Sequence, residues 1–404
     1  MNKNFKNKQE RGITLIALVV TIVVLLILAG VSISLVLSNN GVISKSKDAR
    51  NQYAEAQTND EKQLNEVSDW IEETVGEKAG GSDYDPASDG VPIPEGYYYV
   101  GGTKAKGLVI SDAEADNEKY KGQENVGKDL SGNQWVWVPV ETPSSLYTTV
   151  AAGQALSGST GVKTTKYTNS AMISGITRVE PGVTNSYREP DIVTTYDNED
   201  RAKIAGFSSL ANMAETMVSE YDEMIRSLEK YHGFYIGRYE LTANGEKTGA
   251  TQTGITWYEH YKNCTTLASG TKVKTRMIWG LQWDATCNWL DSSGFSITNS
   301  SAWGNYSNYN TSNNYATTDV KYEAGAGSKQ ETGSSENWKA NNIYDFAGNC
   351  YEFTQEADNF DSRAYRGGRY STNGSSNPAS YRYDSLPAGA LSYDGSRPTL
   401  YLIP

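Results

Sequence analysis

The sequence is poor in the residues on which most redox and metal-dependent enzymes rely. It contains three cysteines, Cys264, Cys287 and Cys350, and only two histidines, His232 and His260. No CxxC pair occurs, so neither a cysteine-based zinc site nor thioredoxin-type redox chemistry is indicated. A disulfide between Cys264 and Cys287 is one alternative for the cysteines, and three small buried thiols are the other, which we favour.

Charged residues are also scarce, at 21% of the chain, and the formal net charge is −12. An acidic chain repels the phosphate backbone, so we expect no nucleic-acid partner. The chain is instead rich in Gly and aromatics, with 28 Tyr and 9 Trp, which is typical of a folded, turn-rich, β-leaning protein and not of a disordered one. The length of 404 residues allows two or three domains, or one large domain with an appendage.

A long apolar run follows a basic leader. Residues 13–37 are almost wholly apolar, and as a helix they would extend roughly 37 Å, enough to cross a hydrocarbon core of about 30 Å. The basic leader, residues 1–12, predicts a cytoplasmic N-terminus and an external remainder. The run is too long for a secretory signal peptide, whereas a plain single-pass anchor stays open.

The junction Arg11-Gly12-Ile13-Thr14-Leu15-Ile16 resembles the cleavage site of type IV prepilins. The resemblance implies that a prepilin peptidase cuts between Gly12 and Ile13, and that other pilin-like subunits are partners. The family carries Glu at the fifth mature position, where this chain has Ala17. This departure favours a minor pilin, a tip subunit or a pilin-like protein that does not polymerise.

The chain divides into four segments. Apolar residues recur at helical spacing over 45–77, so we expect one long helix over 13–78, after the leader 1–12. Residues 79–96 combine Gly, Pro, Ser and Asp and predict a linker. A head domain would then occupy residues 97–404.

Hydrophobic periodicity predicts several elements within the head. An apolar stripe over 210–228, with Ser208 or Ser209 as its cap, indicates a helix. Trp and Val alternate in the segment 134–140, which indicates a strand with the aromatic rings on one face. The other expected elements are strands over 97–100, 107–110 and 233–241, a helix over 279–291, and an irregular stretch over 141–200.

A series of motifs lies in the last third of the chain. They read NIYDFAGNCYEFT from Asn342, then RGGRY from Arg366, SYRY from Ser380 and GSRP from Gly395. In order and spacing they resemble the formylglycine-generating enzyme, or sulfatase-modifying factor, family, best over residues 230–404. The resemblance implies an α+β, C-type-lectin-like fold with short strands, few helices and long loops.

The resemblance does not extend to the catalytic residues of that family. Its oxidising members bind copper through two cysteines, whereas this chain has Ser380 at the second position and Tyr370-Ser371-Thr372 around the first. A serine hydroxyl does not replace a thiolate as a copper ligand. No GxSxG, Walker or HExxH motif occurs either, so we expect that the protein is not an enzyme and has no redox cofactor.

Two interpretations are open for three polar residues of the main motif. Asp345, Asn349 and Glu352 could supply oxygen ligands to a calcium ion. The alternative, which we favour, is that they are hydrogen-bonded polar groups of the core.

Binding is the function that remains. In the same fold, binding proteins carry a variable surface after the RGG motif, and this stretch here is rich in Tyr, Ser, Gly and Asn, as antibody paratopes are. The resemblance implies the ligand-binding residues Arg369, Tyr370, Thr372, Asn373, Asn377, Tyr381, Tyr383, Asp384, Tyr393 and Asp394.

We therefore expect a display protein, anchored in the membrane through residues 13–37 or incorporated in an extracellular pilus, whose head binds an extracellular protein or glycan. A structural minor pilin without a ligand is the first alternative. A degenerate enzyme is the second.

Overall fold

The structure, a computed structural model, describes most of the chain from residue 89 onward. The described residues are 89–143, 148–149, 167–168, 187–190, 192–193, 195–268, 272–309, 325–358 and 361–404. The predicted leader, the helix over 13–78 and the processing residues Gly12 and Ile13 lie outside them. All described residues belong to one compact unit.

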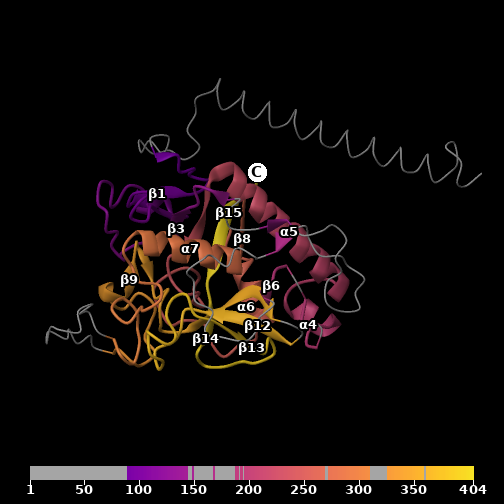
Figure 1. Ribbon diagram of the computed structural model, residues 1–404. Coiled ribbons are helices and arrows are strands. Elements are labelled where there is room, and N and C mark those ends of the chain that lie inside the picture. Colours follow the sequence, from indigo (N-terminus) through magenta and orange to yellow (C-terminus); the bar gives the residue numbers. More distant parts are fainter. Residues whose placement is uncertain are drawn as a thin grey trace, which may run out of the picture. The chain divides into compact units, whose positions relative to one another are not determined.

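A six-stranded antiparallel sheet has the order β1-β2-β3-β7-β15-β8. The last strand in the sequence, β15, lies between β7 and β8, so the C-terminal strand is an interior strand of this sheet (Figure 1). Its strands are β1 (Tyr98–Gly101), β2 (Val109–Ser111), β3 (Gln134–Pro139), β7 (Gly233–Gly237), β8 (Val273–Met277) and β15 (Pro398–Leu402).

This sheet is buried on both faces. Along β3, Val136 and Val138 belong to the main hydrophobic core, whereas Trp135 and Trp137 belong to a second core on the opposite face. The predicted separation of Trp and Val onto two faces is thereby confirmed, because successive side chains of a strand alternate. The second core also contains Val91 and Ile93, two residues of the predicted linker.

A second sheet is built mainly from the motif-bearing last third of the chain. Its order is β13-β12-β11-β14, with β14 parallel to β11, and β6 pairs with the far end of β11. These strands are β6 (Tyr187–Arg188), β11 (Tyr351–Asp358), β12 (Ser362–Arg366), β13 (Arg382–Ser385) and β14 (Asp394–Ser396). Short two-stranded pairs are formed by β4 (Thr148–Thr149) with β5 (Tyr167–Thr168), and by β9 (Lys339–Ala340) with β10 (Ile343–Tyr344).

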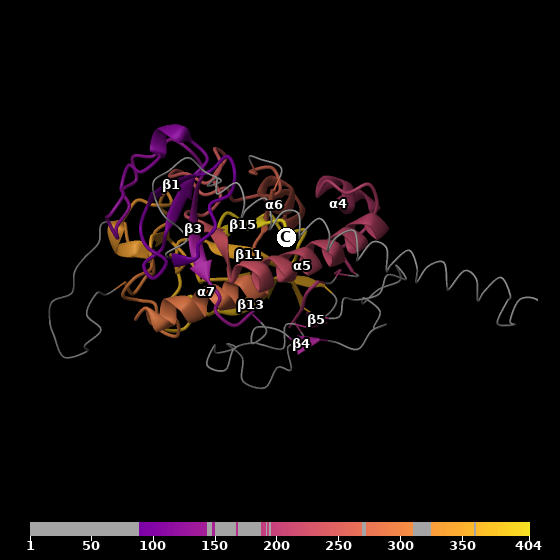
Figure 2. The same ribbon diagram turned by 90° about the horizontal axis from the view of Figure 1, so that it is seen from above.

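Helices cover and connect the two sheets. The 22-residue helix α5 (Leu210–Tyr231) packs against β7 and β15, and α7 (Gly280–Ser292) contacts both β3 and β11 (Figure 2). The short helices α4 (Glu199–Ile204) and α6 (Trp257–Cys264) pack on each other, and 3-10 turns span η1 (Glu114–Asp116) and η3 (Glu336–Trp338). The prediction of α5 is confirmed together with its cap, because the Ser209 hydroxyl accepts a hydrogen bond from the Asn212 N–H at 3.0 Å.

The expected fold class was wrong. We expected a long N-terminal helix and a lectin-like head with few regular elements, but the described residues form a sheet-rich fold with fifteen strands and four α-helices. Short motifs report local backbone geometry and do not specify which distant strands pair. The pairings that define this fold, such as β15 with β7 and β8, join residues more than 100 positions apart.

The expected location also needs correction. In the part of the chain that the structure describes, no helix combines the length and the apolar character needed to cross a membrane. For that part, this finding contradicts the prediction of a single-pass membrane protein. Residues 13–37, on which it rested, lie outside the described residues.

Candidate functional site

Five tyrosines gather on one side of the second sheet, and we call them the tyrosine face: Tyr351, Tyr365, Tyr381, Tyr383 and Tyr393. Tyr365 on β12 lies directly opposite Tyr383 on β13 in the strand register, which places both rings on the same face. The ring centroids of Tyr351 and Tyr365 are 4.1 Å apart, and those of Tyr381 and Tyr383 are 6.1 Å apart. Strand pairing therefore assembles a continuous aromatic surface.

Part of the tyrosine face is open to solvent. Tyr383 is 36% exposed, Tyr365 and Tyr393 are partly exposed, and Tyr351 and Tyr381 are buried. Two further large hydrophobic side chains, Leu386 and Leu391, are exposed in the segment between β13 and β14. Exposed apolar side chains are a typical feature of an interaction site.

Arg369 lies over two rings of the tyrosine face. Its guanidinium carbon is 3.8 Å from the centre of the Tyr393 ring and 5.5 Å from that of Tyr351. The preceding residues Gly367 and Gly368 have φ angles of 85° and 74°, a conformation that favours glycine. The two glycines therefore allow the chain to leave β12 and turn back so that Arg369 stacks on the rings.

Asp394 follows Tyr393 at the start of β14 and lies opposite Tyr351 in the strand register. Its side chain is buried, its Oδ2 atom accepts a 3.5 Å hydrogen bond from Ser385, and its Oδ1 atom has no hydrogen-bond partner. Burial raises the pKa of the Asp394 carboxyl to about 7, although the positive charge of Arg369 acts in the opposite direction. The carboxyl group thus titrates near neutral pH.

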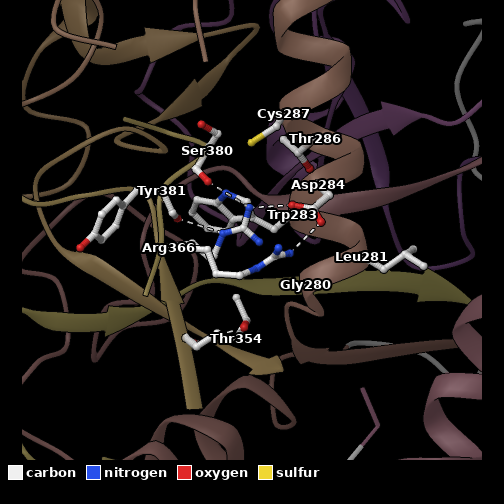
Figure 3. A network of polar contacts seen from close by, with 12 residues as sticks. Gly280, Leu281, Trp283, Asp284, Thr286, Cys287, Thr354, Arg366, Ser380 and Tyr381 are labelled. Carbon is white, nitrogen blue, oxygen red and sulfur yellow. Dashed lines mark hydrogen bonds and ion pairs between the residues drawn. The ribbon is translucent and has the colours of Figure 1, made fainter. Parts of the chain in front are cut away.

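The opposite side of the second sheet is a buried ionic network. Arg366 and Arg382, which are paired across β12 and β13, each bind one oxygen of the Asp284 carboxylate on α7, at 2.6 and 2.8 Å. Arg382 also binds Glu356 at 3.0 Å. Figure 3 shows the Tyr381 ring pointing away from the Arg366–Asp284 pair. The network fixes β12 and β13 to α7 and so gives the tyrosine face a rigid support.

Several of the ten predicted ligand-binding residues come together at this surface. Tyr381, Tyr383 and Tyr393 belong to the tyrosine face, and Arg369 and Asp394 lie next to it. The Thr372 hydroxyl donates a hydrogen bond to the Arg369 carbonyl, and the Asn377 amide donates one to the Tyr351 hydroxyl. Asn373 lies in the turn after Thr372, where its side chain accepts hydrogen bonds from Ser375 and Asn308. Tyr370 is half-buried.

Asp384 does not belong to the tyrosine face. It is the neighbour of Tyr383 on β13 and pairs with Ala364, so its side chain points to the other face of the strand. Sequence reasoning also missed Tyr351 and Tyr365 as members of the surface. The segments around Tyr365 and Tyr383 both read Tyr-Arg or Arg-Tyr, and this shared alternation is the signal that could have indicated two paired strands with one aromatic and one basic face.

The three residues considered for calcium are engaged with the protein. Asp345 accepts two hydrogen bonds from residues 332–333, Asn349 accepts two at 3.0 Å, and Glu352 forms an ion pair with Arg397 at 2.6 Å. Across the described ranges, no cluster of three or more His, Cys, Asp or Glu side chains is placed to hold a metal ion. These contacts favour the alternative of hydrogen-bonded core groups.

The cysteine thiols are free and buried. Burial raises the pKa of Cys264, Cys287 and Cys350, which keeps all three thiols protonated at neutral pH. The alternative of three buried thiols is confirmed.

A hollow of about 620 Å³ is lined by other parts of the fold, including Trp289 on α7 and the ion pair of Lys104 with Glu141 at 2.9 Å. None of the ten predicted ligand-binding residues lines it. We therefore place the candidate site at the tyrosine face.

Comparisons with known proteins give distant likenesses in structure. Searches of protein-family models and of curated proteins found no match. Among solved structures, Treponema denticola variable protein 1 is 17% identical, with a TM-score of 0.28, over 43% of this chain and 85% of that one. The crystal structure of CarF is 14% identical, with a TM-score of 0.30, over 43% of this chain and 87% of that one. The resemblances to prepilins and to the sulfatase-modifying family stay predictions.

Proposed function

We propose that this chain is a binding protein, and that it recognises a protein or glycan partner through the tyrosine face. The observation that carries the proposal is the cluster of five adjacent tyrosine rings, of which Tyr383 is exposed, together with the exposed Leu386 and Leu391 in the segment that joins β13 to β14. Soluble proteins rarely leave such side chains together in water unless they contact a partner.

The composition of this surface suits recognition. Tyrosine supplies a large contact area and loses little side-chain entropy on binding, because it has only two rotatable side-chain bonds. The surrounding Ser, Thr and Asn side chains can donate and accept hydrogen bonds. Central aromatic residues surrounded by polar ones are typical of interface hot spots.

The partner can be sought by screening the full-length chain against arrayed glycans and displayed peptides, with Tyr383→Ser as the variant. Tyr383 is exposed, so its replacement leaves the buried ion network intact. We expect the affinity for any specific ligand to fall by about tenfold or more, since loss of a hot-spot aromatic costs about 2 kcal/mol.

The matched control is Tyr98→Ser, because Tyr98 is also partly exposed but lies on the edge strand β1 of the first sheet. This variant should bind as the unmodified chain does, and both variants should unfold at the same temperature. Ligands that bind equally to the unmodified chain and to Tyr383→Ser would refute the proposal.

A further inference from the structure

We propose that the tyrosine face binds an acidic saccharide, whose carboxylate is bound by Arg369 next to the buried Asp394 carboxyl while its sugar ring lies on the tyrosines. This inference rests on the proposed function and specifies the ligand class of the same site.

Arg369 has no anionic partner among the described residues, unlike the five arginines that form ion pairs with Asp or Glu. Arg397 binds Glu352, Arg363 binds Asp197, and Arg276 binds Glu220, each at less than 3 Å. Within the described ranges, no carboxylate lies within ion-pair distance of Arg369, and its Nε atom has no hydrogen-bond partner.

The stacking of Arg369 prepares it for an external anion. Its guanidinium carbon lies 3.8 Å from the centre of the Tyr393 ring, so this contact holds the guanidinium over the tyrosines before any ligand binds. The planar fork of guanidinium N–H groups matches the two oxygens of a carboxylate and loses little entropy when it binds.

Asp394 sets the charge next to Arg369. Its Oδ1 atom is buried and has no hydrogen-bond partner, and an unsatisfied buried polar atom is costly. The charged and titratable groups around it are Arg369, Tyr351, Tyr365, Tyr393 and, on the packed helix α6, His260. Burial raises the pKa of Tyr351 and Tyr365 and lowers that of His260 to about 4, so these three side chains stay neutral between pH 6 and 8. While it is protonated, this buried carboxyl places no negative charge next to Arg369 and so does not oppose the binding of an anion.

The surrounding side chains favour a sugar as the carrier of the carboxylate. Thr372, Asn373, Ser375 and Asn377 are short, neutral hydrogen-bonding groups close to the stacked rings. They suit the hydroxyls of a saccharide, whose apolar ring face can lie on tyrosine. A uronic acid combines this ring with a carboxylate.

The proposal predicts a specific pH dependence. The pKa of Asp394 is about 7, so its carboxyl is mostly neutral at pH 6 and mostly ionised at pH 8. At pH 8 the negative charge of the ionised group repels the ligand carboxylate. We therefore expect affinity to fall as the pH rises from 6 to 8.

The test uses the full-length chain and two probes, a trimer of galacturonic acid and its methyl ester, which has the same sugar chain but carries no charge. Calorimetric titration at pH 6 should show the acid binding about tenfold more tightly than the ester, which corresponds to about 1.4 kcal/mol. At pH 8 the affinity for the acid should be several-fold lower, while that for the ester should be unchanged.

Two variants separate the roles of the charges. Arg369→Gln should remove the preference for the acid over the ester, and Asp394→Asn should remove the pH dependence of acid binding. Lys121→Gln is the matched control, since Lys121 is an exposed cation on another part of the fold, paired with Glu118. It should bind like the unmodified chain, and unfolding temperatures would confirm that every variant is folded.

Equal binding of acid and ester, no saturable binding of the acid, or an unchanged pH profile in Asp394→Asn would each overturn the inference. The proposed function would survive these results if Tyr383→Ser still weakened binding of a ligand from the screen. Selective capture of acidic peptides in place of the saccharide would likewise refute the ligand class proposed here.

Discussion

Gly348 shows how a single residue of the main motif is constrained by its surroundings. Its φ angle is 80°, and a Cβ atom at this position would lie 2.2 Å from the Asn305 carbonyl oxygen. The Gly348 N–H donates to the Gly367 carbonyl at 2.7 Å, so the turn before β11 is joined to the turn after β12. A side chain here would disturb the support of the tyrosine face.

We expect Gly348→Ala to destabilise the protein strongly, because it combines backbone strain with a clash against the main chain. The strain alone costs about 1–2 kcal/mol. The matched control is Gly90→Ala, since Gly90 has a φ angle of 66° but nothing within 4 Å of the added methyl group. Urea unfolding of both variants would isolate the clash, and an equal loss of stability in the two would show that the close approach to Asn305 is unimportant.

The short helix α6 illustrates how local signals act at the scale of an element. Thr256 and Glu259 form a capping box, in which the Thr256 hydroxyl accepts from the Glu259 N–H and the Glu259 carboxylate accepts from the Thr256 N–H at 2.8 Å. The T-x-x-E signature stands in the sequence, but our prediction missed this helix. Its residues are mainly aromatic and polar, and burial on several sides obscures a helical stripe.

Removal of the cap should destabilise α6 and the sheet edge that it covers. We expect Thr256→Ala to lower the free energy of unfolding by about 1 kcal/mol, as is usual for a lost N-cap. Thr253→Ala changes a nearby threonine outside the helix and should have a smaller effect. Denaturant midpoints would measure both, and a larger loss for Thr253→Ala would contradict the assigned role of the cap.

At the scale of the whole molecule, buried carboxyl groups dominate the electrostatics. Burial raises the pKa of Asp345 to about 6 and that of Asp394 to about 7, and it raises the pKa values of Glu189, Glu240, Glu246 and Glu352 as well. These groups keep protons in the folded state that they release in the unfolded state. Stability should therefore fall as the pH rises from about 5 to 7.

A few other groups oppose this loss of stability with rising pH, or act only outside this pH range. Burial lowers the pKa of His260 to about 4, so this one residue favours the folded state as the pH rises towards 6.5. Asp116 and Glu336 have lowered pKa values and affect stability only in more acidic solution. The carboxyl groups with raised pKa values outnumber His260. Each additional proton bound by the folded state changes the free energy of unfolding by about 1.4 kcal/mol per pH unit.

Guanidinium chloride unfolding at pH 5, 6 and 7 would measure this dependence. We expect the free energy of unfolding to decrease across the series, and Asp394→Asn to make the decrease shallower because the amide does not titrate. A free energy that increases from pH 5 to 7 would contradict the protonated state of the buried carboxyl groups.

The sequence alone determined the local elements that show a clear hydrophobic periodicity or a helix-capping residue. The apolar stripe and Ser209 specified α5, and the alternation of Trp with Val specified β3 and its two faces, because both signals act between residues close in the chain. The tertiary structure alone decided the rest. Strand pairing places Tyr351 and Tyr365 next to the predicted binding residues, and burial makes Asp345 and Glu352 hydrogen-bonded groups of the core. Both results depend on contacts between distant segments, which no local sequence pattern encodes.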